Sequence, residues 1–408
     1  MPDISSYSGV DMASIGKISG IDVPSGGSAS EPTSGFLTIG GSFEQNNALR
    51  HGSDDKGTFQ EATFHSSVTT PPTVSQITKV KPGRYHIGML DSSGNLYMTS
   101  TGSNETGSSS IYGGYNRQFV VELTGVADFD LGKDHALAVK TDGTLWGIGP
   151  NSDGELGRGD TSSQYSSFAQ IGTDTNWSKV GCGDDFSIAL KTTGALYSAG
   201  KNKDGRTGQG TTSGDTITWT QIGSDTNWTS ISAGESSCGA IKGGQLYTWG
   251  DGGSGMLGNG STSTDETSPY LANSDTDWQD VFVGGDYTKA IKTTSGHHYH
   301  SGAGGSFGGG CRGDGSTTST TTFTRIGTDT GWQEFINLVY GSFAYYVWGK
   351  KNDSFYVCGR VSGSPYIKTG GTATTSNTTT FVELADPAPS YFIILNYDSS
   401  RPEAFYLI

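Results

Sequence analysis

The sequence Asp-Thr-Asn-Trp at residues 174–177 decides the fold, because near copies of it follow at residues 225–228, 275–278 and 329–332. The three copies read Asp-Thr-Asn-Trp, Asp-Thr-Asp-Trp and Asp-Thr-Gly-Trp. They lie about 50 residues apart, and a fixed period of this size is typical of repeat proteins in which each unit is one supersecondary structure. Repeats of this kind mostly build surfaces, so the period predicts an architecture before it predicts any chemistry.

Each unit has the same internal order of short apolar runs and glycine-containing turns. In the unit from Trp177, residues 183–190 read Gly-Asp-Asp-Phe-Ser-Ile-Ala-Leu and residues 194–200 read Gly-Ala-Leu-Tyr-Ser-Ala-Gly. A glycine-rich loop, Asn-Lys-Asp-Gly-Arg-Thr-Gly-Gln-Gly, follows at residues 202–210. Short apolar runs between Gly, Asp and Asn turns indicate strands, and no stretch has the apolar period of a helix. The sequence therefore predicts an all-β protein.

The predicted strands carry large and small residues on alternate faces. Phe186, Ile188 and Leu190 face one way, whereas Ser187 and Ala189 face the other, and neither face is charged. A sheet that is covered on both faces by neighbouring sheets needs this pattern. Four-stranded blades packed radially satisfy it, and closing them into a ring limits the number of exposed sheet edges.

The consensus of these units resembles the repeats of the regulator of chromosome condensation family. It reads Gly-x-x-His-x-x-Ala-Leu, then Gly-x-Leu-Tyr-x-Trp-Gly, then Asn-x-x-Gly-x-Leu-Gly-x-Gly. The resemblance is strongest at residues 126–159, 177–210 and 228–260 and fades in the units from Val281 and Phe335. It implies a seven-bladed β-propeller. It implies little about function, because a fold does not determine the site that is built on it.

Counting units gives seven blades if one blade is split between the two ends of the chain. The segment Phe381–Leu384 echoes Phe119–Leu123, which precedes the unit at Val126. We therefore expect residues 381–408 and 36–76 to share the closing blade, although the sequence does not tell which end supplies which strand. The predicted propeller covers residues 36–408, and its other repeats begin near residues 77, 126, 177, 228, 278 and 332.

The first 35 residues differ from the repeats, and we interpret residues 1–35 as a docking arm with a linker. Ser-Gly-Val-Asp at residues 8–11 returns as Ser-Gly-Ile-Asp at 19–22, and the Ser/Gly-rich residues 25–35 are typical of a linker. Short N-terminal repeats of this type resemble the leading segments of structural proteins of tailed phages, including marine phages. The alternative is that the arm packs on the rim of its own propeller. The candidate docking residues, which have no evident partner in the ring and suit strand addition to a partner protein, are Ile4, Val10, Ile15, Ile18, Ile21 and Val23.

Charge and composition exclude several classes of function. The net charge of −15 argues against a nucleic-acid partner, because such surfaces are basic. No apolar run approaches the roughly 20 residues that a membrane-spanning helix needs, so we expect no membrane insertion. The start of the chain at Met1 lacks the basic and apolar regions of a secretory signal, which favours assembly in a host cytoplasm. The 64 glycines suit a chain with many turns.

Cysteine and histidine patterns do not predict a convincing metal or disulfide site. Cys182, Cys238, Cys311 and Cys358 lie in four different units without a Cys-x-x-Cys pair, so we expect free thiols rather than disulfides or zinc ligands. The cluster at residues 297–300 has the composition of a metal site, but a strand decorated with histidines explains it more simply. Its second and fourth residues, both histidines, would share one face of that strand.

Other familiar motifs are explained by turns and packing. Arg-Gly-Asp at 158–160 and 312–314 lies within the glycine-rich loops of the repeat, and Asp153 and Asp204 lack the further carboxylates of a calcium loop. His135, like His86, occupies a repeat position that varies elsewhere, which favours packing. We find no supported nucleophile with a base, no phosphate-binding loop and no paired carboxylates. The sequence thus predicts no catalytic, cofactor or metal site.

These observations favour a non-enzymatic structural or binding component of a phage virion, in the tail, a fibre or the head surface. The arm would anchor it to other virion proteins, and the ring would decorate the particle or bind a host-surface glycan or protein. A free propeller that binds or inhibits another protein, like the propeller-type β-lactamase inhibitors, is the alternative. The missing secretory signal counts against that alternative. An enzyme with a site in the propeller channel is the third hypothesis.

Overall fold

The computed structural model describes residues 36–39, 59–61, 63–64, 66–73, 76–83, 87–101, 115–161, 164–305, 312–336, 346–352, 354–359, 368–369, 372–373, 378–383, 391–398 and 401–407. Regular structure within these ranges is β, apart from short 3-10 turns such as η4 (Lys203–Gly205) and η5 (Gly253–Gly255). The all-β prediction is therefore confirmed. No helix in these ranges is long and apolar enough to cross a membrane. The predicted arm, residues 1–35, lies outside the described residues.

Four consecutive units each form an antiparallel four-stranded sheet whose strands follow one another in sequence order. The first strand of three of these sheets begins at a tryptophan of the repeated motif. The strands are β8 (Val126–Leu131), β9 (Ala136–Lys140), β10 (Leu145–Gly149) and β11 (Tyr165–Ile171); β12 (Trp177–Cys182), β13 (Phe186–Lys191), β14 (Leu196–Gly200) and β15 (Thr216–Gln221); β16 (Trp228–Ala233), β17 (Ser237–Lys242), β18 (Gln245–Gly250) and β19 (Glu266–Asn273); and β20 (Trp278–Val283), β21 (Tyr287–Lys292), β22 (His298–Gly302) and β23 (Thr320–Arg325).

Two sheets beside this regular arc have the same core of four strands with additions. In one, a short parallel strand, β3, pairs with the last strand, β7. In the other, a small hairpin, β27–β28, intervenes in sequence before the last strand. The strands are β3 (Thr63–Phe64), β4 (Ile77–Pro82), β5 (Ile87–Asp91), β6 (Leu96–Thr101) and β7 (Tyr115–Leu123); and β24 (Trp332–Ile336), β25 (Tyr346–Lys351), β26 (Ser354–Gly359), β27 (Lys368–Thr369), β28 (Thr372–Ala373) and β29 (Thr378–Glu383).

A further sheet combines strands from both ends of the chain. Its order is β2-β1-β31-β30, with Leu37 of β1 opposite Tyr406 of β31. The N-terminal region thus supplies one pair of strands and the C-terminal region the other, and β30 lies beside β4. The strands are β1 (Phe36–Ile39), β2 (Phe59–Glu61), β30 (Tyr391–Asp398) and β31 (Arg401–Leu407).

The segment around Phe381 lies elsewhere than the sequence suggests. We expected residues 381–408 to begin the split blade, but β29 pairs with β26 and completes the sheet that starts at Trp332. The similarity of this segment to residues 119–123 has a structural basis. Those residues lie in β7, which, like β29, is the last strand of its sheet in chain order. A last strand precedes the next unit, so the echo marks where a sheet ends.

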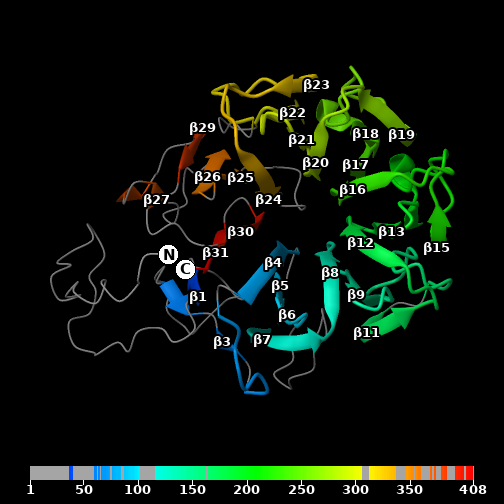
Figure 1. Ribbon diagram of the computed structural model, residues 1–408, viewed down its shortest axis with the longest axis vertical. Helices are drawn as coiled ribbons and strands as arrows, with labels where there is room; N and C mark the ends of the chain where they lie inside the picture. The colour runs from blue at the N-terminus through cyan, green and yellow to red at the C-terminus, as the bar shows by residue number, and fades with distance from the viewer. Residues whose placement is uncertain are drawn as a thin grey trace.

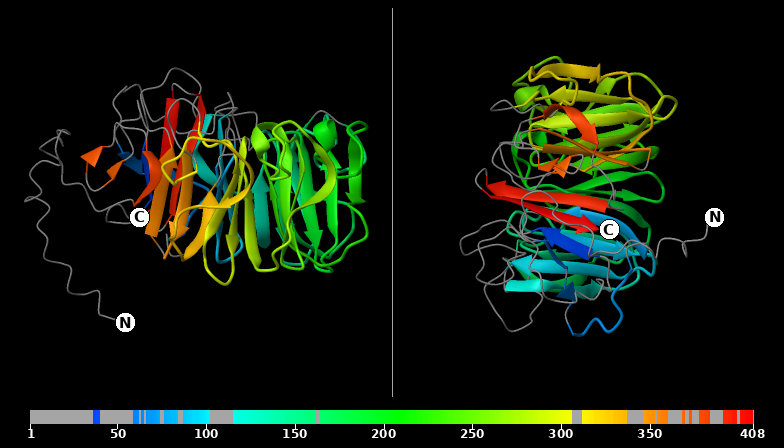
Figure 2. Two further views of the ribbon diagram at one scale, coloured as in Figure 1. Left: turned by 90° about the horizontal axis from the view of Figure 1, so that it is seen from above. Right: turned by 90° about the vertical axis from the view of Figure 1, so that its left-hand side faces the viewer.

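The sheets are arranged like spokes, with the first strand of each toward a common centre and the last at the periphery (Figure 1). Successive first strands lie next to one another, from β4 to β8, β12, β16, β20 and β24. The side views show the sheets standing face to face along this arc (Figure 2). The four sheets from β8 to β23 therefore have neighbours on both faces, as the uncharged alternation within their strands requires.

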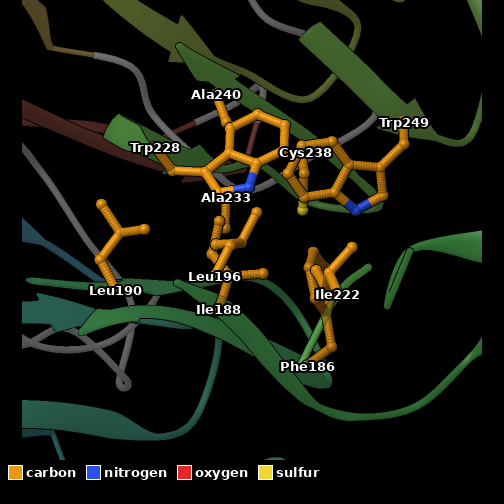
Figure 3. Close-up of a cluster of buried hydrophobic side chains, with 10 residues drawn as sticks. All are labelled: Phe186, Ile188, Leu190, Leu196, Ile222, Trp228, Ala233, Cys238, Ala240 and Trp249. Atoms are coloured by element: carbon orange, nitrogen blue, oxygen red, sulfur yellow. The ribbon is translucent and has the colours of Figure 1, made fainter. Parts of the chain in front are cut away.

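The core lies between the sheets, as the alternation predicted. Phe186, Ile188 and Leu190 of β13 point to one side and pack with Trp228 and Ala240 of the next sheet (Figure 3). On the other face of β13, small residues allow close approach of the preceding sheet. Its residue 189, an alanine, is fully buried in the cluster that includes Leu137 and Val139 of β9.

The repeated Asp and Trp have linked structural roles. Trp177, Trp228, Trp278 and Trp332 are each at most 4% exposed, so the motif tryptophans are buried between the sheets. A lysine at the end of the neighbouring strand covers each indole ring and forms an ion pair with the aspartate of the motif. The Nζ–Oδ2 distances are 2.5 Å for Lys191–Asp174, 2.7 Å for Lys242–Asp225, 2.6 Å for Lys292–Asp275 and 2.8 Å for Lys351–Asp329.

The glycine-rich loop fastens each sheet to the next. Gly159 N–H donates to the carbonyl of Ile217 in β15 at 2.8 Å, so the loop after β10 reaches the outer strand of the following sheet. Gly157 has a φ of +65°, and a Cβ there would lie 2.5 Å from the Trp219 ring. Both glycines are therefore needed for conformation or close approach. The same N–H contact recurs from Gly210 to Thr267, from Gly260 to Thr321 and from Gly315 to Thr379.

Candidate functional site

The first strands β4, β8, β12, β16, β20 and β24 together line a cavity of about 370 Å³. The third residue of each strand faces this cavity, and most of these residues are charged. The cavity is therefore a polar channel between sheets that are otherwise apolar inside. These third residues are Lys79, Asp128, Lys179, Ser230, Asp280 and Glu334.

Asp128 connects three neighbouring strands at one level of the channel. The Lys79 ammonium of β4 lies 2.6 Å from Asp128 Oδ1. The other oxygen, Oδ2, accepts a hydrogen bond from the backbone N–H of Val180 in β12 at 3.0 Å. An inner strand has one unpaired side, so the carboxylate satisfies a backbone donor that would otherwise need water.

Asp130 repeats this arrangement one step along the channel. The ammonium of Lys81 lies 3.4 Å from Asp130 Oδ1, while the N–H of Cys182 donates to Oδ2 at 3.0 Å. The nearby Asp130 carboxylate raises the pKa of Lys81, against the opposite effect of burial. Both aspartates thus serve as structural fasteners between β4, β8 and β12.

Side chains of β16 and β20 make the equivalent junction with hydroxyl groups. Ser230 Oγ donates a short hydrogen bond to Asp280 Oδ1, which also accepts from the N–H of Val281 at 2.9 Å. Ser232 Oγ accepts from the N–H of Val283 at 3.0 Å. The backbone donors on this edge of β20 are therefore satisfied by polar side chains.

The junction between β12 and β16 is different. Lys179 occupies the place that Asp128 has in β8, and its ammonium donates to the carbonyl of Thr229 at 3.0 Å. Gly181 occupies the place of Asp130 and provides no side chain. Across the channel, burial raises the pKa of Glu334, an effect that Lys350 and Lys81 partly oppose.

The loops between first and second strands form an acidic face around one mouth of the sheets. Burial, followed by the Glu235 charge, raises the pKa of Asp184 to about 7. Burial likewise raises the pKa of Asp286 to about 6, with further contributions from Glu235 and Asp251. Asp184 N–H donates to the carbonyl of Glu235 at 3.3 Å, so adjacent loops are joined by their backbones. The pKa values of Asp184 and Asp286 thus lie above the usual range of an aspartate.

The histidines of β22 are part of the packing. His298 and His300 share one strand face, as predicted, and both are buried. The His298 ring lies 4.8 Å from the Trp332 ring, and His300 stacks on Tyr287 at 5.7 Å. Burial lowers the pKa of both well below the usual histidine value. Within the described residues no group of three or more potential metal ligands occurs.

His135 and the cysteines also lie in buried packing positions. His135 Nε2 lies 2.8 Å from Ser187 Oγ in the next sheet, and burial lowers its pKa to about 4. Cys182, Cys238 and Cys358 are free and buried. His86 and Cys311 lie outside the described residues, as do the candidate docking residues Ile4, Val10, Ile15, Ile18, Ile21 and Val23.

The two Arg-Gly-Asp sequences are held within their own loops. Arg312 Nη2 lies 2.6 Å from Asp314 Oδ2, and the Arg158 guanidinium lies 4.1 Å from the centre of the Tyr165 ring. Asp160 accepts a hydrogen bond from the Tyr165 hydroxyl at 2.8 Å. These contacts stabilise the glycine-rich loops, as the turn interpretation predicted.

Sequence reasoning missed the channel residues. The signal was present two residues after three of the motif tryptophans, where Lys179, Asp280 and Glu334 place a charge within a predicted strand. A charge at that position of a predicted buried strand indicates a polar space beside it, because unpaired charges are not buried in an apolar core.

Comparison with known families supports the repeat assignment. A model of the regulator of chromosome condensation (RCC1) repeat matches residues 142–190 and 243–291, and a second model of this repeat matches residues 177–206. The chain thus carries RCC1-type repeats, and the sequence-based resemblance is confirmed for them.

Curated relatives match over short segments. The protein RCC2 homolog of Danio rerio is 36% identical over 78 residues, which are 19% of this chain and 16% of the relative. Human RCC2 is 35% identical over 77 residues, 19% of this chain and 15% of the relative. The human E3 ubiquitin-protein ligase HERC2 is 38% identical over 81 residues, 20% of this chain and 2% of the ligase. The chain therefore matches about a sixth or less of the length of these relatives.

Solved structures extend the likeness to most of the chain. Human WBSCR16 superposes with a TM-score of 0.67 at 16% identity, covering 91% of this chain and 98% of WBSCR16. Prp20p from Saccharomyces cerevisiae gives a TM-score of 0.67 at 13% identity, covering 92% of both chains. At such identities the likeness concerns the fold. The chain is thus a repeat protein with the β-propeller architecture of RCC1-type proteins.

Proposed function

We propose that the chain forms a closed seven-bladed propeller that acts as a non-enzymatic binding protein. The sheet shared by the two ends would be the seventh blade, and the position of β30 beside β4 supports closure on that side. The observation that supports the binding role is that the polar side chains of the channel hold neighbouring strands together. In the channel, Asp128 and Asp130 tie neighbouring strands together, which produces a rigid frame for presenting loops.

The acidic face is the surface that this frame presents. Asp184, Glu235 and Asp286 come from three successive sheets and are held by loops that contact one another. Prp20p, which shares the fold, has binding properties to Gsp1p and histones, so this architecture supports protein recognition. In this proposal the ring contributes a display surface and performs no chemistry.

Within this class we propose a virion component of a tailed phage. The Ser-Gly-Val-Asp and Ser-Gly-Ile-Asp repeat at residues 8–11 and 19–22 supports the proposal, because it resembles leading segments of phage structural proteins. The arm would bind other virion proteins through its apolar residues, and the displayed ring would decorate the particle or bind a host-surface glycan or protein. The protein would be assembled in the host cytoplasm and reside in the virion.

Deletion of residues 1–30 tests this proposal. The ring is built from residue 36 onward, so the variant should remain folded, soluble and monomeric but should be absent from purified virions in a mass-spectrometric analysis. A matched control deletes only residues 25–30, which shortens the linker and keeps the apolar positions. Efficient incorporation of the variant lacking residues 1–30 would show that the arm is not the anchor.

Two other results would redirect the proposal. A large loss of thermal stability after deletion of residues 1–30 would show that the arm packs on its own propeller. Absence of the full-length chain from virions, together with capture of a protein partner by the isolated chain, would favour a free binding protein or inhibitor instead.

A further inference from the structure

The backbone N–H groups of β12 that point into the channel have acceptors in the preceding first strand, β8. The backbone N–H groups of Val180 and Cys182 point away from β13 and donate to Asp128 and Asp130, both at 3.0 Å. Donors on this edge cannot pair within their own sheet, because the first strand has no neighbour on that side. The preceding strand therefore supplies the acceptors.

The strand β16 has the same register as β12. Val180 lies opposite Ala189 in β13, and Ile231 lies opposite Ala240 in β17, with the same irregularity two residues earlier in both pairs. The N–H groups of Ile231 and Ala233 must therefore point toward the channel, as their counterparts in β12 do. Both residues line the cavity.

The acceptors for these two N–H groups are missing from the preceding strand. Where β8 has two aspartates, β12 has Lys179 and Gly181, neither of which offers a side-chain acceptor. A Cβ on residue 181 would lie 3.4 Å from the Ala233 nitrogen, so the glycine leaves open the place from which a side chain would reach that donor. Among the described side chains, none accepts a hydrogen bond from Ile231 or Ala233.

Lys179 makes this place cationic. Its ammonium has three donors and is held beside β16 by the carbonyl of Thr229 at 3.0 Å. No carboxylate of the described residues lies within ion-pair distance of it, in contrast to Lys79, whose partner Asp128 is 2.6 Å away. The channel therefore combines an unpaired positive charge with backbone donors at the same junction.

We infer that the junction of β12 and β16 binds the carboxylate of a small monocarboxylic acid. The ligand carboxylate would take the place that an aspartate at position 181 would fill, accepting from backbone N–H groups and from Lys179. Phe282 and Phe335 line the same cavity, with ring centres 5.7 Å apart, and offer an apolar wall for the body of the ligand.

The other charges of the channel limit the ligand to one negative charge. Asp280 and Glu334 line the cavity from β20 and β24, so a second carboxylate on the ligand would meet two acidic side chains. The cavity of about 370 Å³ accommodates a small aromatic or branched aliphatic acid. This site is independent of the N-terminal arm and of any role in a virion.

Calorimetric titration of the full chain with benzoate tests the inference, with benzamide as its neutral counterpart. Benzoate should bind, and benzamide should not. Lys179→Gln should weaken benzoate binding about tenfold or more, as expected for a hydrogen bond to a charged group. Gly181→Asp should abolish binding, because the new carboxylate occupies the site. Gly181→Ala adds a Cβ that crowds the same place without adding a charge, so it should weaken binding less than Gly181→Asp does.

Amide chemical shifts provide a readout that does not depend on the variants. Benzoate should shift the backbone amides of Ile231 and Ala233 in the unmodified chain. Unchanged shifts at both amides, or benzoate affinity equal in the unmodified chain and Lys179→Gln, would overturn the inference. Tighter binding of the peptide acetyl-Gly-Asp-Gly-amide than of benzoate would also overturn it, since the site would then receive an acidic side chain of another protein.

Discussion

The regular arc from β8 to β23 and the sheet shared by the two ends of the chain are built on opposite principles. In the arc, each sheet comes from one continuous segment, and the same contacts recur, such as the ion pair of Lys191 with Asp174 and that of Lys242 with Asp225. In the terminal sheet, β1 pairs with β31, almost the full length of the chain away. The contacts within and between neighbouring repeats each add to stability and join residues that are close in sequence. Pairing of β1 with β31 instead closes a very long loop, and this closure costs conformational entropy.

This difference predicts which truncation destabilises the protein most. Deletion of residues 391–408 removes β30 and β31, which leaves β1 with an unpaired edge and takes away the strand that lies beside β4. We expect aggregation or a fall in melting temperature larger than that of any point variant below. Differential scanning fluorimetry and size-exclusion chromatography measure both effects. If the truncated chain melts like the full-length chain, the terminal sheet does not lock the ring.

The second largest effect is expected within the arc. Trp228 is buried between two sheets, so Trp228→Ala should lower the free energy of unfolding by about 3–5 kcal/mol. Trp177→Ala and Trp278→Ala should behave alike, because the units are equivalent. Trp146, which is partly exposed, provides a control with a smaller loss. Unchanged denaturation midpoints for the three motif variants would refute the packing described here.

A smaller effect is expected for the fasteners of the channel. Asp128→Ala removes the acceptor of the Val180 N–H and the partner of Lys79, and should lower the free energy of unfolding by about 1–3 kcal/mol. Urea denaturation measures the change, with Asp153→Ala as an acidic control outside the channel. Equal midpoints for Asp128→Ala and the unmodified chain would mean that water replaces the carboxylate without loss.

The smallest effect concerns the pH dependence of the acidic face. The pKa of Asp184 is about 7 in the folded protein against 3.8 for an ordinary aspartate, so the ionised form is disfavoured by folding. Its contribution to stability therefore falls as the pH rises from about 4 to about 7. Asp184→Asn should be more stable than the unmodified chain at pH 8, by about 1 kcal/mol.

The gain from Asp184→Asn should shrink toward pH 5. Asp142 has a lowered pKa, mainly because the Thr144 hydroxyl donates to it, so Asp142→Asn is a control for which no gain at pH 8 is expected. Melting curves from pH 5 to 8 compare the two variants. A gain of Asp184→Asn that is the same at every pH would contradict the raised pKa.

The arc was predictable from sequence because its contacts are local and repeated. The alternation of Phe186, Ser187 and Ile188 predicted which residues share a face of the strand, and the structure confirms this. The same reasoning placed two of the histidines of residues 297–300 on one face of a strand, and the structure adds that both are buried against aromatic rings.

The rest could not be read from the sequence, for three physical reasons. Channel residues such as Lys179 and Ser230 differ from unit to unit, and the role of each depends on the strand that follows it in space. In the terminal sheet, residues 37–39 and 405–407 have the same apolar pattern, so only pairing between distant segments decides their order. Residues 381–383 belong one sheet earlier than predicted for a different reason, since the apolar pattern that they share with residues 119–123 marks the end of a sheet and not its start.

A disulfide between the two ends tests the central claim, that strands from both termini share one sheet, most directly. Leu37 and Tyr406 are opposite each other in β1 and β31, at a spacing that suits a disulfide between antiparallel strands. Trp146→Cys with Gln170→Cys, opposite each other in β10 and β11, is the matched pair in the arc. The account predicts that Leu37→Cys with Tyr406→Cys forms an intramolecular disulfide as completely as the arc pair does. Efficient formation in the arc pair alone would contradict it.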